Sequence, residues 1–212
     1  MTKVHPNAAA SASAAAAAAA ASSDHEKTSS IDDEVSVVLT VWKKSLLLNC
    51  NGFTVFDCQG NLVFRVDNYS ARSKDEILLM DAAGTPLLTI RRKRLGLAEK
   101  WLVFEGESGG KAEARYSAKK QVNLLNPKCL AQVVSLESCN KYKIEGSYTQ
   151  RCCVVYDEKR RRVAEIRKKE AAVGGVAFGA DVFRLIVLPD LDPALAMAFV
   201  ILLNQMFGSS SS

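Results

Sequence analysis

The stretch that decides the fold lies near the carboxyl end and reads Asp190-Leu-Asp-Pro-Ala-Leu-Ala-Met-Ala-Phe-Val-Ile-Leu-Leu-Asn-Gln-Met-Phe-Gly208. Asp192 followed by Pro193 is typical of a helix start, and Gly208 supplies a stop signal. From Ala194 onward no polar residue occurs before Asn204, so the predicted helix lacks a polar face for most of its length. A helix that is apolar all round must be buried all round, either in a membrane or inside a protein.

The length of this helix chooses between the two environments. About 15 residues fall short of the roughly 20 that cross a bilayer, and no basic flank anchors the segment. The chain before it is rich in short β-branched runs, beginning with Val35–Trp42. A helix about 22 Å long matches strands of six or seven residues, and a barrel wider than eight strands has room for it. We therefore predict a helix enclosed by a β-barrel.

A repeated unit supports the β-rich prediction. Phe56–Val66, Met80–Ile90 and Tyr156–Ile166 each contain an apolar strand end, an Asp, a short turn and an alternating strand, which is typical of a β-hairpin. The first two units have a Gly three residues after the Asp, where a positive φ is tolerated. The third has Arg160 there, which predicts either a different turn or backbone strain. Further strands are expected at Trp101–Glu105, Val122–Leu125, Ala131–Ser135, Tyr142–Glu145 and Cys152–Tyr156.

Composition divides the chain into three parts. Residues 1–34 are rich in Ala and Ser with almost no large apolar side chain, so we expect a disordered leader. Residues 35–208 form one expected barrel domain, and 209–212 are a polar tail. Two lysines and five acids give the leader a net charge of −3, which leaves +8 for the rest of a chain that carries +5. We expect this excess of positive charge to favour anionic surfaces.

Residue usage excludes much catalytic chemistry. The two histidines, His5 and His25, both lie in the leader, so a Ser-His-Asp triad or a His-ligated zinc is not expected in the domain. The six cysteines show no CxxC spacing and are expected to be reduced thiols, with at least one of Cys152 and Cys153 facing inward. Neither Gly-rich nucleotide motif is present. We predict no enzyme activity, no catalytic residues, no metal site and no cofactor.

Two basic runs are the candidate binding residues. They comprise Arg91, Arg92, Lys93 and Arg94, and Lys159, Arg160, Arg161 and Arg162. Such clusters could hold anionic headgroups, with Arg acting through its fork and Lys as a point charge. The alternative is a solvated strand end that keeps sheet edges from associating. If Leu88 and Ile90 face the interior, alternation places Thr89, Arg91 and Lys93 outside.

Several ordered motifs resemble one family. They are Leu39-Thr-Val-Trp-Lys-Lys-Ser-Leu46, Asn51-Gly-Phe-Thr-Val-Phe-Asp57, Asn61-Leu-Val-Phe-Arg-Val-Asp-Asn-Tyr69, Leu87-Leu-Thr-Ile-Arg-Arg-Lys93, Ile144-Glu-Gly-Ser-Tyr148 and Asp181-Val-Phe183. Together they resemble the plant LURP-one-related family. The resemblance implies a tubby C-terminal-like fold, an antiparallel barrel of about twelve strands around a hydrophobic C-terminal helix. Relatives in fold include phospholipid scramblases and tubby-like proteins, which bind phosphoinositides, and the family is associated with plant defence.

The combined prediction is a non-enzymatic binding module. We expect it to bind phosphoinositide or other anionic membrane lipid through the two basic runs, in the cytoplasm and peripherally at the plasma membrane. The alternative is a protein-interaction adaptor in defence signalling with no lipid role, and a nuclear location stays open. We expect no nucleic-acid partner and no transmembrane span. Trp42, next to Lys43 and Lys44, is predicted either as a core residue or as an aromatic at a membrane surface.

Overall fold

The computed structural model describes residues 36–46, 51–68, 76–95, 98–107, 112–121, 128–138, 140–169 and 179–208. The predicted leader, the tail and the predicted strand Val122–Leu125 lie outside these residues. The described elements are β1 (Val37–Trp42), β2 (Asn51–Phe56), β3 (Leu62–Asn68), β4 (Glu76–Asp81), β5 (Pro86–Leu95), β6 (Ala98–Glu105), β7 (Tyr116–Lys120), β8 (Cys129–Ser135), β9 (Lys141–Ser147), β10 (Cys152–Tyr156), β11 (Arg162–Lys168), β12 (Val182–Val187) and α2 (Pro193–Phe207).

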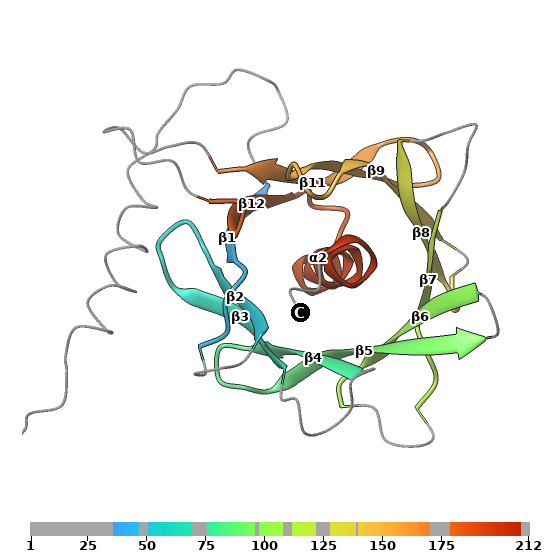
Figure 1. Cartoon of the computed structure of the whole chain (residues 1–212), viewed down its shortest axis with the longest axis horizontal. Helices are drawn as coiled ribbons and strands as arrows, with labels where there is room; N and C mark the ends of the chain where they lie inside the picture. Colours follow the sequence, from blue (N-terminus) through green and yellow to red (C-terminus); the bar gives the residue numbers. More distant parts are fainter. Residues whose placement is uncertain are drawn as a thin grey trace, which may run out of the picture.

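The strands form one closed barrel. Each strand pairs antiparallel with the next along the chain, and β1 closes the ring against β12, with Val37 opposite Val187 and Trp42 opposite Val182. Figure 1 shows the ring of strands around helix α2. The prediction of an antiparallel barrel of about twelve strands around a central C-terminal helix is therefore confirmed.

The ends of α2 follow local chemistry. The carboxylate of Asp192 accepts a hydrogen bond from the backbone N–H of Leu195 at 2.9 Å, and Pro193 occupies the first helical position, where no N–H is needed. Gly208 ends the helix, but with an extended φ of −66° rather than a left-handed one. A Cβ at Gly208 would lie 2.4 Å from the carbonyl oxygen of Asn204. Glycine therefore stands here because the backbone needs room.

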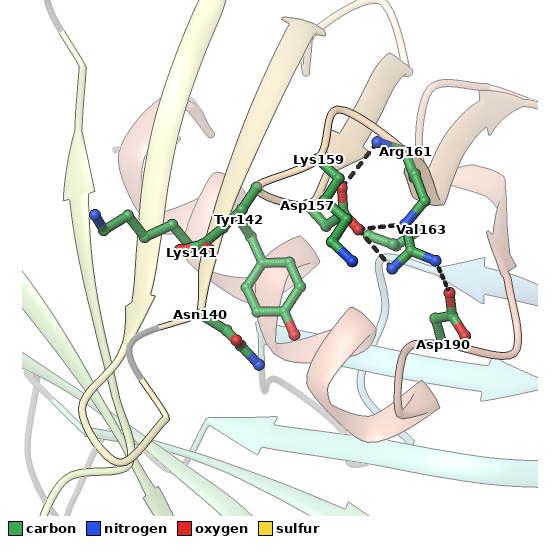
Figure 2. Close-up of a pocket in the computed structure, with 9 residues that line it drawn as sticks. Asn140, Lys141, Tyr142, Asp157, Lys159, Arg161, Val163 and Asp190 are labelled. Atoms are coloured by element: carbon green, nitrogen blue, oxygen red, sulfur yellow. Dashed lines mark hydrogen bonds and ion pairs between the residues drawn. The ribbon is translucent and has the colours of Figure 1, made fainter.

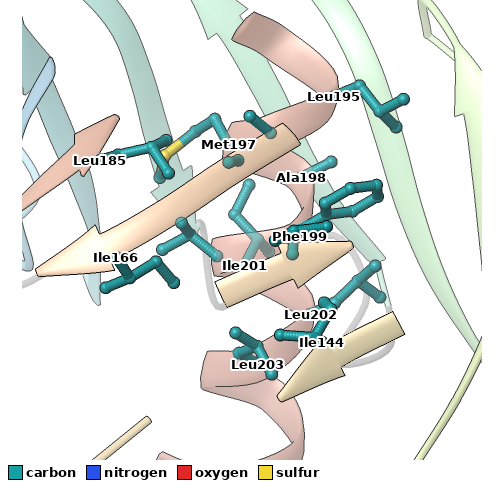
Figure 3. Close-up of a cluster of buried hydrophobic side chains, with 14 of the residues drawn as sticks. Ile144, Ile166, Leu185, Leu195, Met197, Ala198, Phe199, Ile201, Leu202 and Leu203 are labelled. Atoms are coloured by element: carbon teal, nitrogen blue, oxygen red, sulfur yellow. The ribbon is translucent and has the colours of Figure 1, made fainter. Parts of the chain in front are cut away.

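The core of the barrel is the helix itself. Every α2 residue from Leu195 to Leu203 is buried, and Val200 at its middle is 0% exposed. In Figure 3 the labelled helix side chains lie beside Ile144, Ile166 and Leu185, which come from the surrounding strands and belong to the same buried cluster. The barrel wall thus supplies the apolar surroundings that a helix without a polar face requires. No helix in the described part of the chain is long and apolar enough to cross a bilayer.

The three repeated hairpins share one turn. In each, the Asp carboxylate accepts the backbone N–H four residues later, from Asn61, Thr85 and Arg161 respectively. Arg160 adopts φ 62°, close to the 85° and 93° of the glycines in the other two turns. Of the two alternatives for the third turn, backbone strain is right and a different turn is wrong. The matching hydrogen bonds impose the same backbone on all three sequences.

The connections of the antiparallel ring alternate between the two ends of the barrel. The helix begins at the end that carries the β2–β3, β4–β5, β6–β7, β8–β9 and β10–β11 connections. It finishes at the other end, where Lys120 Nζ lies 3.1 Å from the carbonyl oxygen of Met206 and 4.5 Å from the ring centroid of Phe207. A cation at a helix C-terminus complements its partial negative charge.

Candidate anion-binding surface

The first predicted basic run lies on β5. Arg91 faces outward, donates to Glu76 from Nε at 3.1 Å and Nη2 at 2.9 Å, and lies 5.1 Å from the ring centroid of Phe104. Its charge is therefore compensated within the protein. The expected inward positions of Leu88 and Ile90 are confirmed, since both belong to the buried core. Thr89, expected to lie outside, is 0% exposed and donates its hydroxyl to the carbonyl of Gly106 at 2.6 Å.

The other members of this run differ from Arg91. Arg92 is ion-paired with Glu99, and its guanidinium lies 5.7 Å from the ring centroid of the buried Trp101. Lys93 is exposed on the outer face and has no ion pair or hydrogen bond to any described residue. The side chain of Arg94 lies outside the described residues. Among the described members of the run, Lys93 is thus the one that an anion could reach without breaking an internal pair.

The second run lies at the β10–β11 turn and in the start of β11. Arg160 donates to Glu145 at 2.6 Å and stacks 4.4 Å from the ring centroid of Tyr156. The hydrogen bond to Glu145 raises the pKa of Arg160. Arg162 lies 3.1 Å from Glu165. These two arginines are therefore held by neighbouring carboxylates.

Arg161 and Lys159 line a pocket of about 250 Å³. Figure 2 shows the Arg161 guanidinium between the carboxylates of Asp157 and Asp190, each at 2.8 Å. The pocket is lined by Asn140, Lys141, Tyr142, Asp157, Glu158, Lys159, Arg161, Val163 and Asp190. Its cations are matched by an equal set of acids, so the pocket does not favour an anion over a neutral or zwitterionic group.

The structure does not bring the two runs together. β5 and β11 are six steps apart in a ring of twelve strands, so they lie on opposite walls of the barrel (Figure 1). The runs also lie toward opposite ends, because Arg92 and Lys93 are near the end of β5, whereas Lys159 belongs to the β10–β11 turn. A single site made from both runs is not compatible with this placement.

Charge is divided between the two ends of the barrel. We name the end at which α2 finishes the basic end; its described cations are Lys43, Lys44, Arg92, Lys93, Lys100, Lys119, Lys120, Lys128, Arg151, Arg167, Lys168 and Lys169, against the acids Asp67, Glu76, Glu99 and Asp181. At the acidic end, where α2 begins, acids outnumber cations. The acids are Asp57, Asp81, Glu105, Glu107, Glu113, Glu137, Asp157, Glu158, Asp190 and Asp192, and the cations are Arg115, Lys141, Lys159, Arg160, Arg161 and Arg162. The charge of the described residues is therefore polarised along the barrel axis.

The most concentrated feature of the basic end is a row of three lysines, which we call the lysine ladder. Lys93 of β5 lies directly opposite Lys100 of β6, which lies directly opposite Lys119 of β7. All three point outward, because Trp101 and Ala118 beside them are buried inside the barrel. None has an ion pair or a hydrogen bond within the described part of the chain. Adjacent strands are about 4.8 Å apart, so the ladder spans about 10 Å.

Comparison with known proteins gives the family. The family model described as LURP-one-related matches residues 37–204, nearly all of the described barrel. The chain belongs to the LURP-one-related family. Protein LURP-one-related 8 of Arabidopsis thaliana is 46% identical over 212 residues, which cover 99% of this chain and all of that protein. Protein LURP-one-related 5 of the same plant is 44% identical over 174 residues, covering 80% of this chain and 83% of its own.

A solved structure has the same fold. The X-ray structure of an Arabidopsis thaliana protein matches with a TM-score of 0.58 at 25% identity, covering 81% of this chain and 91% of that one. The resemblance of the sequence motifs to the LURP-one-related family is thereby confirmed at the levels of sequence and fold.

Other candidate groups of this LURP-one-related chain have structural roles. Cys153 is buried inside the barrel, and desolvation raises the pKa of its thiol to about 12, whereas Cys152 is exposed. The prediction that at least one of the two faces inward is confirmed. No group of His, Cys, Asp and Glu that could hold a metal occurs among the described residues.

Sequence reasoning missed Lys100 and Lys119. Each stands in a strand with ordinary alternation, and neither belongs to a basic run. The signal that could have found them is the outward position of each lysine, combined with the pairing of β5, β6 and β7. Hairpin register would have been needed to set the three side by side.

Proposed function

We propose that this chain is a non-enzymatic binding module that attaches reversibly to anionic phospholipid membranes through the basic end of its barrel. The lysine ladder is the observation that carries the proposal. Like charges placed directly opposite each other across a sheet destabilise it. Three lysines side by side on adjacent strands therefore do not stabilise the barrel, and their placement is better explained by binding to an anionic partner.

Protection of a sheet edge does not explain this placement. Charged residues at strand ends often prevent edge-to-edge association, but a closed barrel has no free edge. An anionic partner would relieve the repulsion along the ladder, and the end of a barrel can approach a flat bilayer. Lysine suits such a surface because it acts as a point charge on a flexible stem.

The expected attraction is modest and depends on salt. Each cation near an anionic bilayer contributes about 1 kcal/mol, so the ladder together with Lys43 or Lys44 would strengthen partitioning on the order of 10³-fold. Screening reduces this at physiological ionic strength, where the Debye length is about 8 Å. Of the residues predicted from sequence, Lys93 fits the proposal directly, whereas Arg91 and Arg92 would have to exchange Glu76 and Glu99 for lipid phosphate.

The test is co-sedimentation of the full chain with vesicles. Vesicles of phosphatidylcholine alone, with phosphatidylserine and with a phosphoinositide are compared at 50 and 150 mM salt. The variant Lys93→Gln/Lys119→Gln should lose most of the binding to anionic vesicles. The matched control Lys141→Gln/Lys159→Gln removes the same charge from exposed lysines at the acidic end and should bind as the native chain does. Equal loss in both variants would contradict the proposal.

A protein-interaction adaptor without a lipid role is the second candidate. The mixed-charge pocket between Lys141 and Asp190 at the acidic end favours it, because such an arrangement of cations and acids can complement the opposite arrangement on one partner protein and exclude others. Absence of vesicle binding at either salt concentration would favour the adaptor. The link to plant defence that the family resemblance implies belongs to both proposals.

A further inference from the structure

The segment that follows β1 displays an aromatic, a cation and an aliphatic side chain at the basic end. Val41 is buried inside the barrel, so its neighbour Trp42 faces outward, where it is partly exposed. Lys44 is exposed, and its Nζ lies 5.1 Å from the ring centroid of Trp42. Leu46 is 50% exposed, among the most exposed large apolar side chains of the described residues. Of the two alternatives for Trp42, the surface position is therefore the one observed.

Hydrogen bonds hold this segment in place. The backbone N–H of Lys43 donates to the carbonyl of Asp181 at 2.7 Å, and the hydroxyl of Thr54 donates to the carbonyl of Lys44 at 2.7 Å. Ser45 is buried and donates its hydroxyl to Asp67 at 2.6 Å. The three residues that precede the exposed Leu46 are thus each held by a hydrogen bond.

Asp67 accepts the hydrogen bond from Ser45 in a buried position. Its side chain is 0% exposed and lies 3.0 Å from Arg65 Nε, so a buried carboxylate is used to hold Ser45. Gly52, directly opposite Asp67, allows the close approach, because a Cβ there would lie 3.2 Å from Ser45 Cβ and 1.8 Å from the carbonyl oxygen of Val66. Groups on β2 and β3 therefore hold Ser45, the residue directly before the exposed Leu46.

We propose that Trp42, Lys44 and Leu46 form an interfacial anchor that enters the headgroup region of an anionic bilayer. The inference rests on the proposed function and names the side chains that move from water into the bilayer interface on binding. Tryptophan is enriched at membrane interfaces, and lysine keeps its ammonium in the headgroup layer while its stem follows the apolar region. The segment lies at the same end of the barrel as the lysine ladder, although β1 and β6 are five steps apart in the ring, and it carries Lys43 and Lys44 itself. Charge complementarity between this end and an anionic bilayer therefore identifies the occupant as lipid.

The anchor predicts a contribution that salt does not screen. The ladder acts through charge, whereas burial of Trp42 and Leu46 acts through apolar surface. Moving a half-exposed leucine out of water is expected to strengthen binding about fivefold. Binding by the anchor and binding by the ladder are therefore separable by ionic strength.

The experiment uses the full chain and vesicles of phosphatidylcholine and phosphatidylserine. Trp42 is the reporter, because the second tryptophan, Trp101, is 1% exposed inside the barrel. We expect a blue shift of the emission and quenching by lipids brominated near the headgroup. Leu46→Ser should weaken vesicle binding about fivefold. Leu136→Ser is the matched control, since Leu136 is also 50% exposed but follows β8 at the acidic end, and it should bind as the native chain does.

The outcomes separate the anchor from the proposed function. If the chain binds anionic vesicles while the emission is unchanged, or if Leu46→Ser binds as tightly as Leu136→Ser, the anchor is overturned and electrostatic attachment stands. If the chain binds no anionic vesicle at low salt, the proposed function fails and the anchor fails with it. Thermal unfolding of both variants checks that each is folded.

Discussion

Reversing the charge of Lys100 should stabilise the barrel. Lys100 stands between Lys93 and Lys119, so Lys100→Glu replaces two like-charge pairs by two pairs of opposite charge. A favourable cross-strand charge pair contributes roughly 0.2–1 kcal/mol, and like charges cost a similar amount. We therefore expect the free energy of unfolding to rise by about 1–2 kcal/mol. For a domain of this size that is a rise in Tm of roughly 2–8 °C.

Urea unfolding of the native chain and the variant measures this gain. The gain in the free energy of unfolding should be smaller in 1 M NaCl, where the Debye length is about 3 Å. The control is Lys141→Glu, because Lys141 is also a strand lysine on the outside of the barrel but lies opposite the uncharged Val134. A destabilised Lys100→Glu chain, an equal gain in the control, or a gain insensitive to salt would refute the idea that the ladder is held under repulsion. The same variant should bind anionic vesicles less well, as expected when stability is exchanged for function.

Three further outcomes are expected. Val200→Asp should prevent folding, because it buries an unpaired charge at the centre of α2. The control Gln205→Asp changes an exposed position of the same helix and should fold. Circular dichroism distinguishes the two, and a folded Val200→Asp chain would contradict the enclosed helix. Arg160→Gly should change the free energy of unfolding by less than about 1 kcal/mol, because relief of the left-handed backbone strain offsets the lost contacts of Arg160 with Glu145 and Tyr156. A larger change, measured by urea unfolding, would contradict this. Burial raises the pKa of Cys153 and of Tyr148 to about 12, above their unfolded values, so both stay protonated in the folded state. Stability should accordingly fall between about pH 9 and 12, and less steeply in Cys153→Ala; a parallel fall in both chains would speak against this assignment.

The turns and the helix ends could be read from local sequence because their causes are local. Asp57 and Gly60 specify a turn through hydrogen bonds within five residues, and Asp192 with Pro193 specifies a helix start in the same way. Arg160 shows the limit of such reasoning. The pairing of β10 with β11 imposes the turn on a residue that does not favour it.

The candidate binding residues were predicted less completely. A run such as Arg91 to Arg94 is visible in sequence, but its neutralisation is not, because Glu76 and Glu99 reach it from two other strands. Lys93 was found because it belongs to a run. Lys100 was not found, since a single lysine in a strand carries no signal of its own.

The sequence by itself determined that a helix without a polar face must be enclosed and that short repeated hairpins surround it. Both follow from the character of neighbouring residues, because a helix with apolar side chains from Ala194 to Leu203 must be buried on all sides. Only the tertiary structure decided which cations lie together. Closure of the ring fixes the register of every strand, and register sets Lys93, Lys100 and Lys119 side by side while it gives the arginines carboxylate partners. Residues from separate strands meet through pairing, which depends on the whole barrel.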